Sequence, residues 1–132
     1  MGPVNENNVR QYWIMRDLGQ GNFQIFSAVP NRPLESYNEM GVLGKKTSPS
    51  SDNTWFLDTS VFDKMKISVS KYKGKFLGYE SNVVKIKNNY PIDKIDSWKI
   101  KKVENSDHMK TTCFFMAHGQ NKILDMKEKH HK

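Results

Sequence analysis

Three stretches of the chain open with a tryptophan and continue as a short apolar-polar run: Trp13-Ile14-Met15-Arg16, Trp55-Phe56-Leu57-Asp58 and Trp98-Lys99-Ile100-Lys101. The chain has three tryptophans in its 132 residues, and they are 42 and 43 positions apart. Runs of this kind, bounded by turn-forming residues, are typical of β-strands. The even spacing therefore suggests a repeated unit of about 42 residues, which the positions after each tryptophan can test.

The positions after each tryptophan repeat as well. A second strand-like run is expected at Phe23–Ser27, Met65–Val69 and Cys113–Met116, and a third at Pro33–Ser36, Phe76–Tyr79 and Ile123–Met126. Each third run holds one leucine, nine or ten residues after an apolar residue of the second run: Leu34, Leu77 and Leu124. A fourth run follows at Gly41–Lys45 and Val83–Lys87, and the tail Lys127–Lys132 completes the third unit.

The sequence therefore predicts an all-β fold of one domain, with three units of four strands at residues 10–52, 53–95 and 96–132. Turns rich in Gly and Pro separate the runs, and no helix is expected except a short turn at Ser36–Met40. Three similar units that close on each other would remove exposed sheet edges. The three tryptophans and the three leucines would then share one core.

Basic residues outnumber acidic ones by 21 to 14, which gives a formal net charge of +7. Lys85, Lys87, Lys99 and Lys101 alternate with apolar residues, which places them on the solvent face of two strands. A solvated face that resists aggregation explains such lysines. An anionic partner (a phosphoinositide, a heparin-like glycan or a nucleic acid) or a protein partner would use the same lysines.

Residues for catalysis or metal binding form no recognisable motif. The turn Gly19-Gln20-Gly21-Asn22 lacks the lysine of a phosphate-binding loop, and the four histidines lack zinc-type spacing. The single cysteine, Cys113, excludes an intrachain disulfide, and its apolar neighbours favour a buried thiol over a nucleophile. We therefore expect a protein that is not an enzyme and that needs no cofactor or metal.

We also expect no targeting signal. The segment Met1–Arg10 is polar and lacks the apolar centre of a signal peptide. No apolar stretch is long enough to span a bilayer. We expect a cytoplasmic protein, with unconventional secretion left open.

Each tryptophan is preceded, two residues earlier, by a polar side chain: Gln11-Tyr12-Trp13, Asn53-Thr54-Trp55 and Asp96-Ser97-Trp98. With the three-unit pattern, the chain resembles the β-trefoil fold, and within it the ricin-B-type lectins, whose repeats carry a Gln-x-Trp signature. The resemblance covers residues 10–129 through short spaced motifs. It implies a six-stranded barrel closed by a hairpin cap, and a non-catalytic module that binds carbohydrate.

The lectin resemblance also implies three shallow pockets, each with an acidic residue after the third strand and an amide at the Gln-x-Trp position. The first pocket would hold Glu35 with Asp52 and Asn53. The second would hold Tyr79 or Glu80 with Asp96, although Gly78 occupies its acidic position. The third would join Asp125 to Gln11, which matches the lectin pattern best. A protease inhibitor, acting through Pro30-Asn31-Arg32-Pro33 or Asn88-Asn89-Tyr90-Pro91, is a further alternative.

Overall fold

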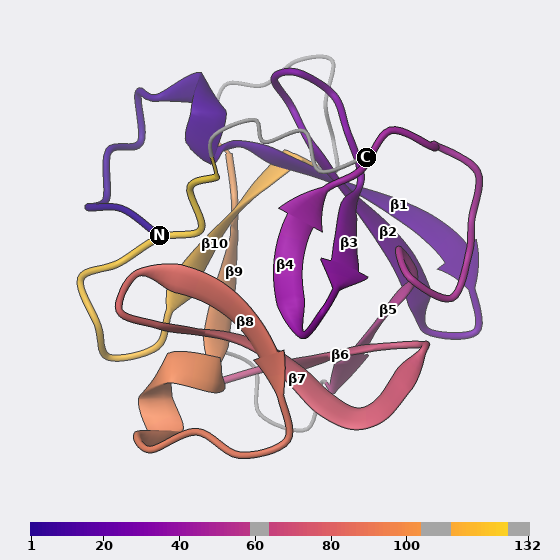
Figure 1. Cartoon of the computed structure of the whole chain (residues 1–132). Coiled ribbons are helices and arrows are strands. Elements are labelled where there is room, and N and C mark those ends of the chain that lie inside the picture. The colour runs from indigo at the N-terminus through magenta and orange to yellow at the C-terminus, as the bar shows by residue number, and fades with distance from the viewer. Residues whose placement is uncertain (59–63, 104–111, 127–132) are drawn as a thin grey trace.

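The computed structural model describes residues 1–58, 64–103 and 112–126, and this part of the chain is almost entirely strand and turn (Figure 1). Ten strands form within it: β1 (Trp13–Gly19), β2 (Asn22–Ser27), β3 (Leu34–Tyr37), β4 (Met40–Leu43), β5 (Trp55–Asp58), β6 (Lys66–Val69), β7 (Tyr72–Glu80), β8 (Val83–Lys87), β9 (Trp98–Lys102) and β10 (Thr112–Ala117). Two short 3-10 helices, η1 (Val9–Gln11) and η2 (Asp93–Asp96), complete it. The all-β prediction is confirmed.

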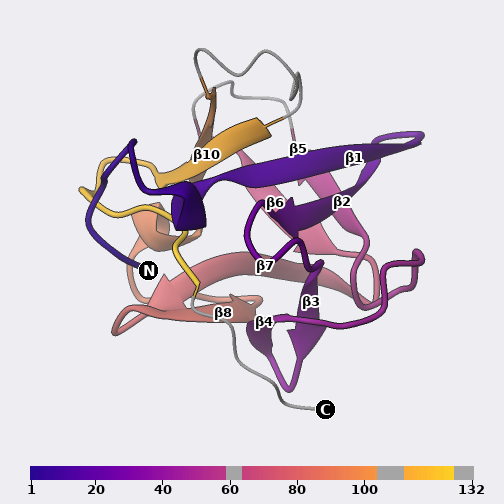
Figure 2. The same cartoon turned by 90° about the horizontal axis from the view of Figure 1, so that it is seen from above.

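The strands form one antiparallel sheet in the order β3-β4-β8-β7-β6-β5-β2-β1-β10-β9. No ladder joins its two end strands, β3 and β9. An isolated bridge does connect β9 to the residue before β6, because Met65 and Trp98 exchange two backbone hydrogen bonds of 2.8 Å. Figure 2 shows β3, β4 and β8 on one side of the molecule, with β1, β5 and β10 on the other.

Two details differ from the sequence prediction. The residues Ser36–Met40 form no helical turn: β3 continues to Tyr37 and a tight turn leads into β4, with Asn38 and Glu39 at φ of 49° and 61°. Polar residues of this kind tolerate left-handed backbone, which makes them suited to a two-residue hairpin. The third run of the last unit forms only bridges at Ile123, and the tail Lys127–Lys132 lies outside the described residues.

The three tryptophans occupy the centre of the core and are 0% exposed. Each indole N–H donates to the backbone carbonyl oxygen of one of the three predicted core leucines. The three hydrogen bonds are Trp13 to Leu124 (3.0 Å), Trp55 to Leu34 (2.9 Å) and Trp98 to Leu77 (2.9 Å). The leucine side chains are also 0% exposed, so the predicted burial of all six residues is confirmed.

A second hydrogen bond occurs three times at matching places. The residue that follows β2, β6 or β10 donates its backbone N–H to the carbonyl oxygen of the residue before Trp13, Trp55 or Trp98, respectively. The pairs are Ala28 with Tyr12 (2.9 Å), Ser70 with Thr54 (2.9 Å) and His118 with Ser97 (2.8 Å). The N-terminal residues lie beside the last described residues, where Gly2 and Ile123 form an isolated bridge (Figure 1).

Among the described residues, no helix has the length and apolar character needed to cross a membrane.

Candidate ligand-binding site

The residues predicted for the third pocket come together from opposite ends of the chain. Gln11 ends helix η1, two residues before the buried Trp13, and Asp125 directly follows Leu124, whose carbonyl oxygen accepts the indole N–H of Trp13. The same tryptophan anchor therefore positions both side chains. The amide Nε2 of Gln11 donates to Oδ2 of Asp125 at 3.0 Å.

The N-terminal strap, which we define as residues Gly2–Glu6, lies over this pair. Gln11 is 1% exposed, and its Nε2 also donates to the carbonyl oxygen of Pro3 at 2.9 Å. Its Oε1 accepts the backbone N–H of Asn5 at 2.9 Å. A Cβ atom on Gly2 would lie 3.0 Å from Oδ2 of Asp125, so the strap approaches the carboxylate closely.

The carboxylate of Asp125 is largely covered but lies near a cationic side chain. Its side chain is 12% exposed, and Oδ1 lies 3.9 Å from Nη2 of Arg10, whose side chain is 47% exposed. A carboxylate accepts hydrogen bonds, an amide both donates and accepts, and a guanidinium donates. Asp125, Gln11 and Arg10 therefore offer the donors and acceptors that a pair of hydroxyl groups needs.

The second predicted pocket is filled by an aromatic ring that the sequence prediction did not include. A Cβ atom on Gly78 would lie 2.7 Å from Cζ of Tyr90 and 2.7 Å from the carbonyl oxygen of Ile95. The Tyr90 hydroxyl lies 2.6 Å from the carbonyl oxygen of Phe76 and 2.9 Å from that of Lys85. Burial raises the pKa of Tyr90. The glycine at the acidic position is thus explained, because the tyrosine ring takes the space of a side chain.

The other residues of the second pocket have separate roles. Tyr79 is 7% exposed and packs against Trp98 with ring centroids 6.4 Å apart, and burial raises its pKa. Glu80 forms an ion pair of 2.7 Å with Lys87. Asp96 is buried, and its Oδ2 lies 3.0 Å from Nζ of Lys66. Its Oδ1 is buried and has no hydrogen-bond partner within the described part of the chain.

The first predicted pocket uses its amide within its own loop. Asn53 is 1% exposed, its Oδ1 accepts the N–H of Ser50 at 2.8 Å, and its Nδ2 donates to the carbonyl oxygen of Ser48 at 3.0 Å. Asp52 forms an ion pair with Lys71 at 3.0 Å. The carboxylate of Glu35, from β3, lies against Gly44, where a Cβ atom would overlap it. At the third position, by contrast, a hydrogen bond of 3.0 Å joins the acidic residue to the amide.

The four lysines of the predicted basic face lie on two strands, β8 and β9, that are not neighbours in the sheet. Lys87 pairs with Glu80, and Lys101 pairs with Glu6 at 3.1 Å. Two of these four lysines thus form ion pairs with glutamates.

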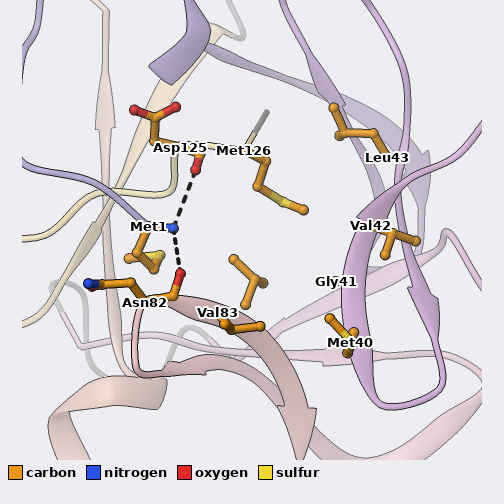
Figure 3. Close-up of a pocket in the computed structure, with 10 residues that line it drawn as sticks. Met1, Met40, Gly41, Val42, Leu43, Asn82, Val83, Asp125 and Met126 are labelled. Carbon is orange, nitrogen blue, oxygen red and sulfur yellow. Dashed lines mark hydrogen bonds between the residues drawn. The ribbon is translucent and has the colours of Figure 1, made fainter. Parts of the chain in front are cut away.

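A cavity of about 240 Å³ opens beside the candidate site, between the β3–β4 hairpin, the turn into β8 and the chain after β10 (Figure 3). Its lining is mostly aliphatic and thioether: Met1, Met40, Gly41, Val42, Leu43, Asn82, Val83, Val84, Asp125 and Met126. Sequence reasoning did not find it. Met1, Met40 and Met126 are far apart in the sequence, and methionine is usually a core residue.

The described residues give little support to metal binding, to a nucleophilic cysteine or to the two inhibitor loops. No group of three or more His, Cys, Asp or Glu side chains in them could hold a metal ion. Cys113 is buried, and burial raises the pKa of its thiol. Of the proposed inhibitor loops, Pro33 is buried, and Phe26 forms a bridge with it. Tyr90 of the other loop is held by its hydroxyl hydrogen bonds.

No family model matches the chain, and a search of curated proteins gives no significant match.

Proposed function

We propose that this chain is a non-catalytic β-trefoil module that binds carbohydrate at the Gln11–Asp125 position. The trefoil part is supported by the two sets of threefold hydrogen bonds, one from the indoles and one from the backbone. It is also supported by the Met65–Trp98 bridge, which links the strands from β6 through β5, β2, β1 and β10 to β9. Those six strands are the number that a trefoil barrel needs.

The carbohydrate part is carried by one observation, the 3.0 Å hydrogen bond between Gln11 Nε2 and Asp125 Oδ2. The bond fixes the orientation of the carboxylate, and it joins the two residues that the lectin resemblance pairs. Sugar hydroxyl groups are both donors and acceptors, and a preorganised carboxylate with a neighbouring amide is a suitable partner. The corresponding side chains of the other two positions, Asn53 and Asp96, bond to a local loop and to Lys66 instead.

A glycan array followed by calorimetric titration tests this function. The wild-type chain should bind at least one glycan, and Asp125→Asn, which keeps the shape but removes the charged acceptor, should weaken binding by at least about tenfold. Asp52→Asn is the matched control, because it removes the carboxylate next to Asn53 in the first predicted pocket. Its affinity should equal that of the wild type.

Salt dependence separates carbohydrate recognition from charge capture. Binding of a neutral glycan should change little between low and moderate salt, whereas phosphate-type contacts by lysines weaken steeply. An array without any bound neutral glycan contradicts the proposal. So does binding that vanishes with salt and survives Asp125→Asn; that result would indicate an anionic partner.

A further inference from the structure

The geometry points to the N-terminal strap as an internal competitor for the candidate site. A ligand and the strap cannot occupy Gln11 and Asp125 at the same time, so the strap sets the apparent affinity for the ligand. This inference rests on the proposed function and adds its regulation.

The strap occupies the hydrogen-bonding groups that a ligand would use. Its Pro3 carbonyl accepts from Nε2 of Gln11, and its Asn5 N–H donates to Oε1 of the same side chain, both at 2.9 Å. A backbone carbonyl and a backbone N–H thus supply one acceptor and one donor, which is the pair that two neighbouring sugar hydroxyls would supply. Because Gln11 is only 1% exposed, both sets of partners cannot bind it together.

The strap also covers the carboxylate. The missing side chain of Gly2 allows the backbone to pass Asp125, whose side chain remains only 12% exposed. Gly2 is held there by two hydrogen bonds with the backbone of Ile123, of 3.1 Å and 3.0 Å. Access of a ligand to the carboxylate therefore requires the strap to move.

The attachment of the strap is of the kind that can open. Within the strap, Val4 packs against a small cluster of Val103, Phe114 and Ile123 that is separate from the tryptophan core, whereas the preceding Met1 packs against the tryptophan core itself. At the end of the strap, Glu6 forms an ion pair with Lys101 in which both side chains are well exposed, and such pairs contribute little. Segments with few buried contacts open locally at much lower free energy than the whole domain.

The fraction of molecules in which the strap is open determines the functional consequence. When a ligand binds only the open state, its apparent dissociation constant is the intrinsic constant divided by the open fraction. Weakening the strap should therefore tighten ligand binding, although it removes no contact with the ligand and adds none.

The test compares Val4→Asp with the matched control Val9→Asp, using the full chain and the best glycan from the array. Val4 is packed in the small cluster, whereas Val9 is 49% exposed. Val4→Asp should lower the apparent dissociation constant by about tenfold, and Val9→Asp should leave it unchanged. As a second readout in the unmodified protein, saturating glycan should speed hydrogen exchange at the Asn5 amide, because that amide loses its acceptor on Gln11.

Each outcome decides between the two proposals. If the wild type binds glycan and Val4→Asp binds with equal or lower affinity, the competition is wrong while the carbohydrate function stands. Slower exchange at Asn5 in the presence of glycan also overturns it, because the strap would then be part of the bound site. If neither protein binds any glycan, the proposed function fails and the competition fails with it.

Discussion

The three tryptophan positions and the three positions two residues before them behave in opposite ways. Every indole is buried and donates to a leucine carbonyl at about the same distance. The preceding side chains, Gln11, Asn53 and Asp96, are equally buried but have unlike partners: a strap and a carboxylate, a local loop, and a lysine. The surroundings of the three indoles are thus alike, whereas those of the three polar side chains differ.

The physical reason lies in the partner that each group needs. An indole N–H can be satisfied by any backbone carbonyl, which is present whatever the sequence, so the arrangement survives sequence change. A buried amide or carboxylate needs a specific set of donors and acceptors from its surroundings. Each of the three positions has a different set, and at the third the amide of Gln11 donates to the carboxylate of Asp125.

The largest expected effect is on the repeated core. Trp13→Ala, Trp55→Ala and Trp98→Ala should each lower the free energy of unfolding by about 3–5 kcal/mol, because each leaves a large cavity and an unpaired leucine carbonyl. Urea denaturation followed by circular dichroism measures this. Phe56→Ala, at a side chain that is 49% exposed, is the control and should cost far less. If the three substitutions lowered the free energy of unfolding by clearly different amounts, the three tryptophan positions would not be equivalent.

The second prediction concerns the unit in which a ring fills the pocket. Gly78→Ala should destabilise the protein by about 1–3 kcal/mol, because the new Cβ would meet a backbone carbonyl and the Tyr90 ring, neither of which can easily move. Gly44→Ala is the matched control. Its Cβ would meet only the end of the Glu35 side chain, which can rotate away. Equal stability losses would show that the space at position 78 is not closed by Tyr90.

A smaller loss is expected from Tyr90→Phe at neutral pH, about 1–2 kcal/mol, because the proton of the hydroxyl no longer bonds to the carbonyl oxygens of Phe76 and Lys85 and the N–H of Lys87 loses its acceptor. Thermal unfolding of the two proteins measures it. A variant as stable as the wild type would mean that water replaces the hydroxyl.

The same tyrosine predicts a pH effect. Burial raises the pKa of Tyr90 above its ordinary value of 10.0, so above that pH the unfolded chain loses a proton that the folded chain still holds. Stability then falls as pH rises, by up to about 1.4 kcal/mol per pH unit from this residue. Tyr90→Phe should therefore show a shallower decline than the wild type in urea titrations between neutral and strongly alkaline pH. Identical slopes would contradict the burial of the phenol.

The smallest effect is expected in the first unit. The ion pair of Asp52 with Lys71 joins side chains that are 35% and 45% exposed, so Asp52→Asn should change the free energy of unfolding by less than about 1 kcal/mol. Chemical denaturation at low and high salt would show the change shrink with screening. A larger and salt-independent loss would place this carboxylate among the structural groups of the unit.

Much of the fold could be predicted from the sequence because apolar periodicity and turn residues are local signals. The second runs of all three units, for example, became β2, β6 and β10. The pairing of Gln11 with Asp125 could also be predicted, through the resemblance of the tryptophan motifs to those of ricin-B-type lectins. The role of Tyr90 could not, since its ring reaches Gly78 across the turn after β8 and follows no repeat. The strap was missed because Val4 is a single apolar residue in a polar segment.

The most direct test of the account is hydrogen exchange at the three indole N–H groups, followed by nuclear magnetic resonance. If the tryptophans occupy equivalent places in one cooperative core, all three indole protons should exchange at nearly the same slow rate, set by global unfolding. An indole that exchanges much faster than the other two would contradict the account, because its unit would then open separately.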